Sequence, residues 1–258
     1  MVIDAHVRMP MGDGSWEELT TALEAAGVAR AVLVHPSADH AEAKAALAHA
    51  DAADAVAAAV VWVDVAATDV TNVLDELGGS PLFRGVALPV HVEADNHWLV
   101  SDDVVRGLRA VAARGLTLDV EVEPRQLPSV ERLAELVPEL GIAVAHIGSP
   151  FIARSQREPW GVYMLNVAPY RNVRLKLSGL VSLDTEPASV AHQRLFVDSA
   201  VRLFGHERLM FGSDWPTHVS RAGYAEVLAT TLEAAGPMTS SQREQLLSAT
   251  ARDFYRIS

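Results

Sequence analysis

The stretch that decides the fold lies near the C-terminus and reads Arg208-Leu-Met-Phe-Gly-Ser-Asp-Trp-Pro-Thr-His218. Its apolar residues predict a short buried strand, and the Gly-Ser pair predicts where that strand ends. Asp214 then lies just beyond the strand, where a carboxylate faces a pocket more readily than a core. In a chain of repeated β/α units, catalytic groups collect at this place. The alternative is a β-turn in which Asp214 caps the next helix.

The same kind of short apolar segment recurs along the whole chain. These segments are rich in Val, Ile, Leu and Ala and do not alternate with polar residues, which is typical of parallel strands buried on both faces. The eight expected strands are Val2–His6, Ala29–His35, Ala58–Asp64, Phe83–Leu88, Leu116–Glu121, Ile142–His146, Val173–Leu177 and Leu209–Gly212.

Helical patterns separate these strands. Apolar residues recur at helical spacing from Val197 to Phe204 and from Leu133 to Leu140. Eight β/α units in 258 residues predict an α/β fold, a single (β/α)8 TIM-type barrel spanning residues 1–258 as one domain. A doubly wound open sheet is the competing architecture.

The composition excludes several classes of partner. A formal net charge of −12 argues against nucleic acid and against anionic membrane surfaces. The sequence has no cysteine, so disulfides, thiolate catalysis and thiol-ligated metals are excluded. No signal-peptide pattern is visible, and the longest apolar run, Ala55–Val63, is too short to span a bilayer. We expect a cytoplasmic protein that binds a small, anionic molecule. Assembly into a homo-oligomer is left open.

Polar side chains stand at or just beyond the C-terminal ends of six expected strands. They are His6, His35, Asp64, His146, Ser178 and Asp214. In a closed barrel these ends converge on one mouth, where active sites are built. Any one of the six fits a structural role, but six at one rim indicate a functional site. Nothing in the sequence resembles a GxSxG elbow, a P-loop or a GxGxxG fingerprint, so serine-hydrolase and nucleotide chemistry have little support.

Seven motifs spread over the chain carry a family resemblance. They are Ile3–His6, Val61–Asp64, Phe83–Gly85, Trp98-Leu99, His146–Gly148 with Pro150, Val173–Gly179 and Arg208–Pro216. In these motifs the chain resembles the amidohydrolase superfamily, specifically the branch of 2-pyrone-4,6-dicarboxylate lactonase, sulfomuconolactone hydrolase and several sugar lactonases. The resemblance implies a distorted (β/α)8 barrel. It also implies a hydrolase that opens a lactone or related cyclic ester of a small acidic molecule.

The sequence departs from the family pattern at four places in the expected mouth. The usual His-x-His of the first strand is His6-Val-Arg8, and the usual Arg-Gly-Ile-Arg is Arg84-Gly-Val-Ala87. The usual Asp-His pair is Ala145-His146, and the lysine usual before the following proline is Ser149. Four changes in one mouth indicate a changed substrate or a changed reaction.

The arginine in the first motif bears on metal binding. Residues i and i+2 of a strand face the same side, so His6 and Arg8 should both point into the mouth. A guanidinium has no lone pair to donate, and it would repel a divalent ion about 5 Å away by roughly 6–7 kcal/mol at an effective dielectric near 20. We therefore expect no cofactor. The alternative is that Arg8 turns outward while His6, His146 and Asp214 hold a divalent metal such as zinc.

A metal-free site assigns a role to each catalytic residue. Asp214 is the expected general base that deprotonates water, and His146 orients that water or steadies the oxyanion. His6 completes the catalytic group by hydrogen bonding to the substrate. Arg8 is expected to bind the substrate, either by polarising its carbonyl or by clamping a carboxylate. The alternative, non-catalytic interpretation of Arg8 is a salt bridge to Asp214 in a site that has lost catalysis.

Three further residues are expected to bind the substrate: His35, Ser178 and Trp215. Trp215 could wall the pocket or pack under a loop, and the sequence favours neither. Lys176 has the same strand parity as Ser178, so its direction stays open. Two competing functions remain on the same barrel. One is a decarboxylase, lyase or cyclase, and the other is a catalytically silent ligand-binding relative.

Overall fold

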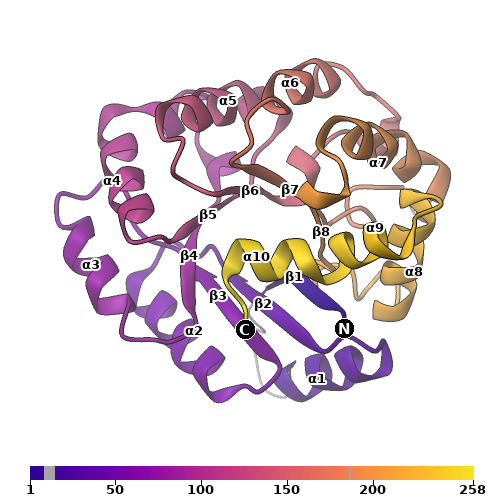
Figure 1. The fold of residues 1–258 in the computed structure, drawn as a ribbon, viewed down its shortest axis with the longest axis horizontal. Helices are drawn as coiled ribbons and strands as arrows, with labels where there is room; N and C mark the ends of the chain where they lie inside the picture. The colour runs from indigo at the N-terminus through magenta and orange to yellow at the C-terminus, as the bar shows by residue number, and fades with distance from the viewer. Residues whose placement is uncertain (9–14, 186) are drawn as a thin grey trace.

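The protein is a ring of parallel strands surrounded by helices (Figure 1). The computed structural model describes residues 1–8, 15–185 and 187–258. Its eight-stranded sheet has the strands in chain order, β1 to β8, as the predicted (β/α)8 barrel requires. The strands are β1 (Ile3–Arg8), β2 (Arg30–His35), β3 (Val56–Val61), β4 (Phe83–Leu88), β5 (Thr117–Val120), β6 (Ile142–Val144), β7 (Val173–Leu177) and β8 (Leu209–Phe211).

Helices form the outer layer and bury their apolar faces against the strands. The helices between the strands are α1 (Ser15–Ala25), α2 (His40–Ala52), α3 (Val70–Leu77), α4 (Asp102–Ala113), α5 (Leu127–Leu136), α6 (Trp160–Val167) and α7 (Val190–Phe204), and α8 (Tyr224–Ala235) follows β8. None of the helices in the described ranges is long and apolar enough to cross a membrane.

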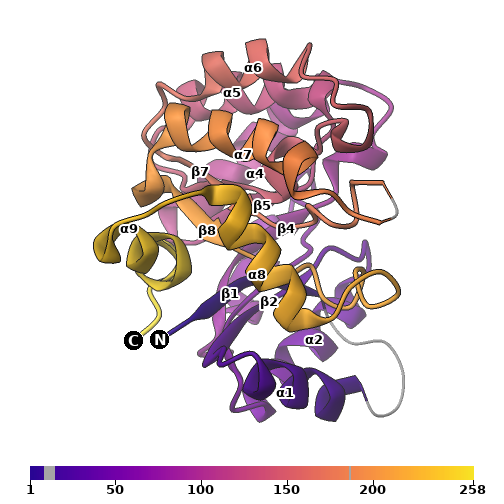
Figure 2. The ribbon, with the colours of Figure 1, turned by 90° about the vertical axis from the view of Figure 1, so that its right-hand side faces the viewer.

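The C-terminal segment covers the end of the barrel where the strands begin. Figure 2 shows α9 (Ser240–Glu244) beside the N-terminus, and α10 (Thr250–Tyr255) crosses in front of β1 in Figure 1. Phe254 and Tyr255 belong to a buried cluster with Ile3. This segment therefore plugs the bottom of the barrel and leaves the opposite end, the mouth, for function.

The first and last strands join through the residues that follow β8, and no regular ladder connects β1 with β8 in the described chain. The backbone N–H of Arg8 donates to the carbonyl of Trp215 at 2.8 Å, and the N–H of Asp214 donates to the carbonyl of His6 at 2.9 Å. The barrel is thus slightly unsealed, which is the expected distortion. The same two bonds place Asp214 beside His6.

Candidate active site

The mouth of the barrel brings together four residues that were predicted from the sequence: His6, Arg8, His146 and Asp214. With Glu121, we call them the mouth cluster. Asp214 Oδ1 lies 3.0 Å from Arg8 Nε, 3.7 Å from His6 Nε2 and 3.9 Å from His146 Nε2. The two imidazole rings meet edge to face, with centroids 4.7 Å apart. Both histidines and Asp214 are buried. Residues far apart in the chain therefore converge as the strand-end argument predicts.

Glu121 completes the mouth cluster and was missed from the sequence. It directly follows β5, and its Oε1 lies 3.1 Å from an Arg8 Nη atom and 3.8 Å from His6 Nε2. A signal was available. Asp119 and Glu121 are acids two residues apart at a strand end, so both side chains face into the barrel.

The backbone at the mouth adopts conformations that few side chains tolerate. His146, Ile147, Ser149 and Asp214 have φ values of 52°, 47°, 48° and 64°. A left-handed β-branched residue such as Ile147 is rare, and strain of this kind gathers at functional sites. The turn ends β6 two residues before the predicted end at His146, and it carries the imidazole over the mouth.

A glycine and a serine after β7 fix the ring of His146. A Cβ on Gly179 would lie 2.6 Å from His146 Nδ1, so only glycine permits this close approach. Ser178 Oγ lies 3.0 Å from the same Nδ1 and accepts from the His146 backbone N–H at 3.1 Å. The structure shows Ser178 bound to His146, and its predicted contact with substrate stays a prediction. Its buried hydroxyl orients His146 and leaves Nε2 directed at the centre.

The two other residues predicted to bind substrate, Trp215 and His35, lie against other parts of the protein. Trp215 is buried in an apolar cluster with Val7 and Tyr224, which is the packing role that the sequence offered as one of two alternatives. His35 ends β2, and its Nε2 lies 3.6 Å from a carboxylate oxygen of Glu42. This contact reaches toward α2, but it is longer than a hydrogen bond, and His35 Nε2 has no hydrogen-bond partner among the described residues. His35 is not part of the mouth cluster.

Charge in the mouth is set by burial and by neighbouring cations. Burial lowers the pKa of His6 well below its usual value, and the charges of Lys176 and His146 lower it further. His6 is therefore neutral near pH 7 and keeps a lone pair. Burial alone would raise the pKa of Glu121, but the charge of Arg8, followed by that of His146, brings it below the ordinary value. Glu121 is thus a carboxylate.

A layer of paired charges, which we call the lower layer, lies beneath the mouth. Lys176 is fully buried and points into the barrel, where it forms an ion pair with Asp119. Its Nζ also donates to the carbonyl of Ala5 at 2.6 Å and lies 3.4 Å from His6 Nδ1. The hydroxyl of Tyr255 donates to Asp119 at 2.9 Å. The direction of Lys176, which the sequence left open, is therefore inward.

Asp4 completes the lower layer on the side of β1 and β8. One of its oxygens accepts from the backbone N–H groups of His6 and Ser213, each at 2.9 Å. The other accepts from the Tyr224 hydroxyl. The lower layer consists of Asp4, Asp119, Lys176, Tyr224 and Tyr255.

The mouth cluster also contains atoms suited to a metal ion. Ligand atoms of His6, Glu121 and His146 all lie within 4.8 Å of one another. His6 Nε2 and Glu121 Oε1 are buried without a well-aligned hydrogen-bond partner among the described residues. Buried polar atoms without a well-aligned hydrogen bond are costly, so two of them at one point indicate a ligand. Two imidazoles and one carboxylate are a donor set that a catalytic zinc ion accepts.

Arg8 lies against the same atoms. Its Nη atom is 3.1 Å from Glu121 Oε1 and 3.4 Å from His146 Nε2. The guanidinium therefore occupies a position where neighbouring carboxylates favour positive charge. It would compete with a metal ion for Glu121 and His146. The side chain is 29% exposed, so it has an open path toward solvent.

The geometry agrees with the comparisons. A family model described as amidohydrolase matches residues 5–257. The chain belongs to this amidohydrolase family. An L-fucono-1,5-lactonase from Burkholderia ambifaria is 32% identical over 83% of this chain and 80% of its own length. A second L-fucono-1,5-lactonase, from Burkholderia multivorans, is 32% identical over 78% of this chain and 72% of its own.

A solved structure bears on the metal. The crystal structure of an amidohydrolase from Burkholderia multivorans with bound zinc has a TM-score of 0.90 and 26% identity to this chain, with full coverage of both. That zinc and the His6, Glu121 and His146 group overturn the expectation of a site without a cofactor, which is wrong. The physical reason is Glu121, whose carboxylate could act as a ligand and adds a negative charge that the argument from Arg8 omitted. The group that could hold an ion contains Glu121, whereas the alternative ligand set named Asp214, and that set stays a prediction.

Proposed function

We propose that this chain is a lactonase that opens the ring of a sugar-type 1,5-lactone by adding water. The observation that carries the proposal is the Asp214 carboxylate, held within 4 Å of both His6 and His146 at the barrel mouth. Both curated relatives described above are L-fucono-1,5-lactonases. Water adds to the carbonyl and the acyl C–O bond breaks, so the ring opens to a polyhydroxy acid with one new carboxylate and one new hydroxyl.

Asp214 is the proposed general base. Arg8 Nε donates to Asp214 Oδ1 at 3.0 Å, and the Ser182 hydroxyl donates to Oδ2 at 3.4 Å. These two contacts fix the plane of the carboxylate while leaving lone pairs for a water molecule. Asp214 takes the proton as water attacks the carbonyl and returns it to the departing ring oxygen.

The other members of the mouth cluster are placed to bind and polarise the lactone carbonyl. His6, Glu121 and His146 would hold a divalent metal, which when bound polarises a carbonyl and lowers the pKa of water. Ser178 keeps His146 Nε2 directed at the centre through its contact with Nδ1. Arg8 offers a fixed positive charge next to Asp214, where the carboxylate product forms.

The experiment is a hydrolysis assay with L-fucono-1,5-lactone, with and without added Zn²⁺, in which a pH indicator follows acid release. Such lactones also open spontaneously, so the rate is compared with that in buffer containing the same metal. We expect wild-type protein to accelerate acid release and Asp214→Asn protein to approach the background. Zinc-loaded, folded protein that accelerates none of a panel of aldono-1,5-lactones would contradict the proposal. Release of CO2 would favour the decarboxylase alternative.

A further inference from the structure

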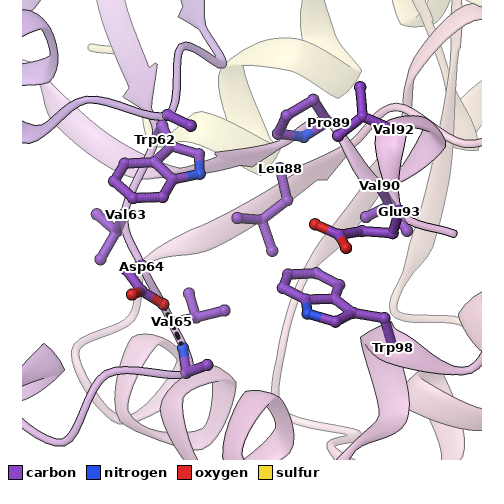
Figure 3. Close-up of a pocket in the computed structure, with 12 residues that line it drawn as sticks. Trp62, Val63, Asp64, Val65, Leu88, Pro89, Val90, Val92, Glu93 and Trp98 are labelled. Atoms are coloured by element: carbon purple, nitrogen blue, oxygen red, sulfur yellow. Dashed lines mark hydrogen bonds between the residues drawn. The ribbon is translucent and has the colours of Figure 1, made fainter. Parts of the chain in front are cut away.

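A second cavity opens at the C-terminal ends of β3 and β4. Its volume is about 270 Å³, slightly below the range typical of drug-sized ligands. Trp62 and Trp98 stand on opposite sides, with Leu88 between them (Figure 3). Both indoles pack partly against the main core and stay partly exposed. The cavity thus offers two aromatic surfaces to a molecule of about the size of a single sugar ring.

Two carboxylates face the same space. Glu93 points between the tryptophans in Figure 3, and its carboxylate forms no hydrogen bond or ion pair with any residue in the described ranges. Asp64 accepts one bond, from the Ala66 backbone N–H at 3.1 Å. No Lys, Arg or His occurs among the described residues that line the cavity. These walls accept hydrogen bonds from hydroxyl groups and disfavour an anion.

One short turn connects this cavity with the mouth cluster. Val90 and Val92 line the cavity, and His91 lies between them in the chain. The His91 backbone N–H donates to the carbonyl of Glu121 at 2.9 Å, and its Nδ1 lies 3.9 Å from Glu121 Oε2. The cavity and the mouth cluster are therefore neighbours at the same end of the barrel.

We propose that this cavity binds the neutral, hydroxyl-bearing part of the substrate and so selects a polyhydroxylated ring. The proposal rests on the function proposed above. The C–H faces of such a ring pack on indole, while its hydroxyls donate to Asp64 and Glu93. An uncharged sugar lactone fits these walls, whereas a lactone with extra carboxylates meets two like charges. The substrate class thus differs from the anionic molecule expected from the sequence.

The probe is L-fucose, a neutral pyranose without an ester bond, titrated by NMR line broadening into full-length protein. Binding can then be observed even if no lactone is hydrolysed. We expect wild type to bind L-fucose, and we expect Trp98→Leu and Glu93→Gln to weaken binding by about tenfold or more, corresponding to about 1.4 kcal/mol. The matched control is Trp16→Leu, which removes a tryptophan that stacks on His49, outside this cavity. It should bind as wild type does.

A second measurement separates this proposal from the lactonase proposal. With the lactone as substrate, Glu93→Gln should raise KM and leave kcat nearly unchanged, because the contact is made equally in ground and transition states. Glu93→Gln retains the side-chain volume, so it serves if Trp98→Leu fails to fold. Hydrolysis with KM unchanged in folded Glu93→Gln would overturn the cavity proposal alone. Loss of L-fucose binding in Glu93→Gln without any lactone hydrolysis would support the cavity and overturn only the lactonase proposal.

Discussion

The lower layer and the mouth cluster lie one above the other in the same barrel, yet they treat their charges differently. In the lower layer Lys176 has Asp119 and Tyr224 has Asp4, so each buried polar group is matched by another. In the mouth cluster His6 Nε2 and Glu121 Oε1 are buried without a well-aligned partner in the described chain. The difference teaches that the lower layer serves the fold, whereas the mouth cluster is arranged for a ligand.

The largest effect should follow from a change in the mouth cluster. We expect Asp214→Asn to lower kcat for lactone hydrolysis by about 10²–10⁴-fold, because general-base catalysis is typically worth that much. The melting temperature should change little. Asp103→Asn, which changes an exposed acid on α4, is the control and should retain full activity. Full activity in Asp214→Asn would remove this residue from the chemistry.

The next effect should come from the lower layer and should appear in stability. Lys176→Met leaves Asp119 buried without its cation, so we expect the free energy of unfolding to fall by about 3–5 kcal/mol. Denaturant titration measures the loss. The matched control is Lys44→Met, which breaks an exposed pair with Glu76 and should cost at most about 1 kcal/mol. Equal losses of unfolding free energy in the two variants would show that the lower layer does not stabilise the fold more than a surface ion pair does.

Arg8 tests whether the mouth cluster is arranged for a cation, because its guanidinium is the positive charge that this cluster already contains. Removing its charge with Arg8→Met should raise Zn²⁺ affinity about tenfold or more, since Glu121 and His146 then lose a competitor. Isothermal titration of chelator-treated protein measures the affinity. An affinity equal to wild type would show that Arg8 does not compete for these ligands.

The smallest effect should be a pH dependence of stability that arises from His6. Burial lowers its folded-state pKa well below 6.5, so the unfolded chain binds the proton more readily. The free energy of unfolding should therefore decrease as the pH falls below 6.5 toward the folded pKa, and it should be level above 6.5. Denaturant titrations of metal-free protein from pH 5 to 8 should show this slope reduced in His6→Asn. A slope that is the same in both proteins would assign the dependence to another group.

The sequence predicted the fold well because each strand is a short apolar run, and a strand end is marked by the first polar residue. It predicted His6, Arg8, His146 and Asp214 at one mouth for the same reason. Glu121 was missed because an acid at the end of an apolar segment looks like an ordinary strand boundary. The surroundings of Ser178 and Trp215 depend on contacts across the barrel, which strand parity alone does not specify. The cytoplasmic location and the homo-oligomer stay predictions.

The most direct test of the account is a Zn²⁺ titration of chelator-treated protein, with bound metal counted by elemental analysis. If His6, Glu121 and His146 form the ligand site, wild type should bind about one equivalent, and Glu121→Gln should lose most of that affinity because a neutral amide replaces the carboxylate. Glu93→Gln, which changes an acid of the second cavity, should bind zinc as wild type does. Wild type without stoichiometric metal, or Glu121→Gln with undiminished affinity, would contradict the account.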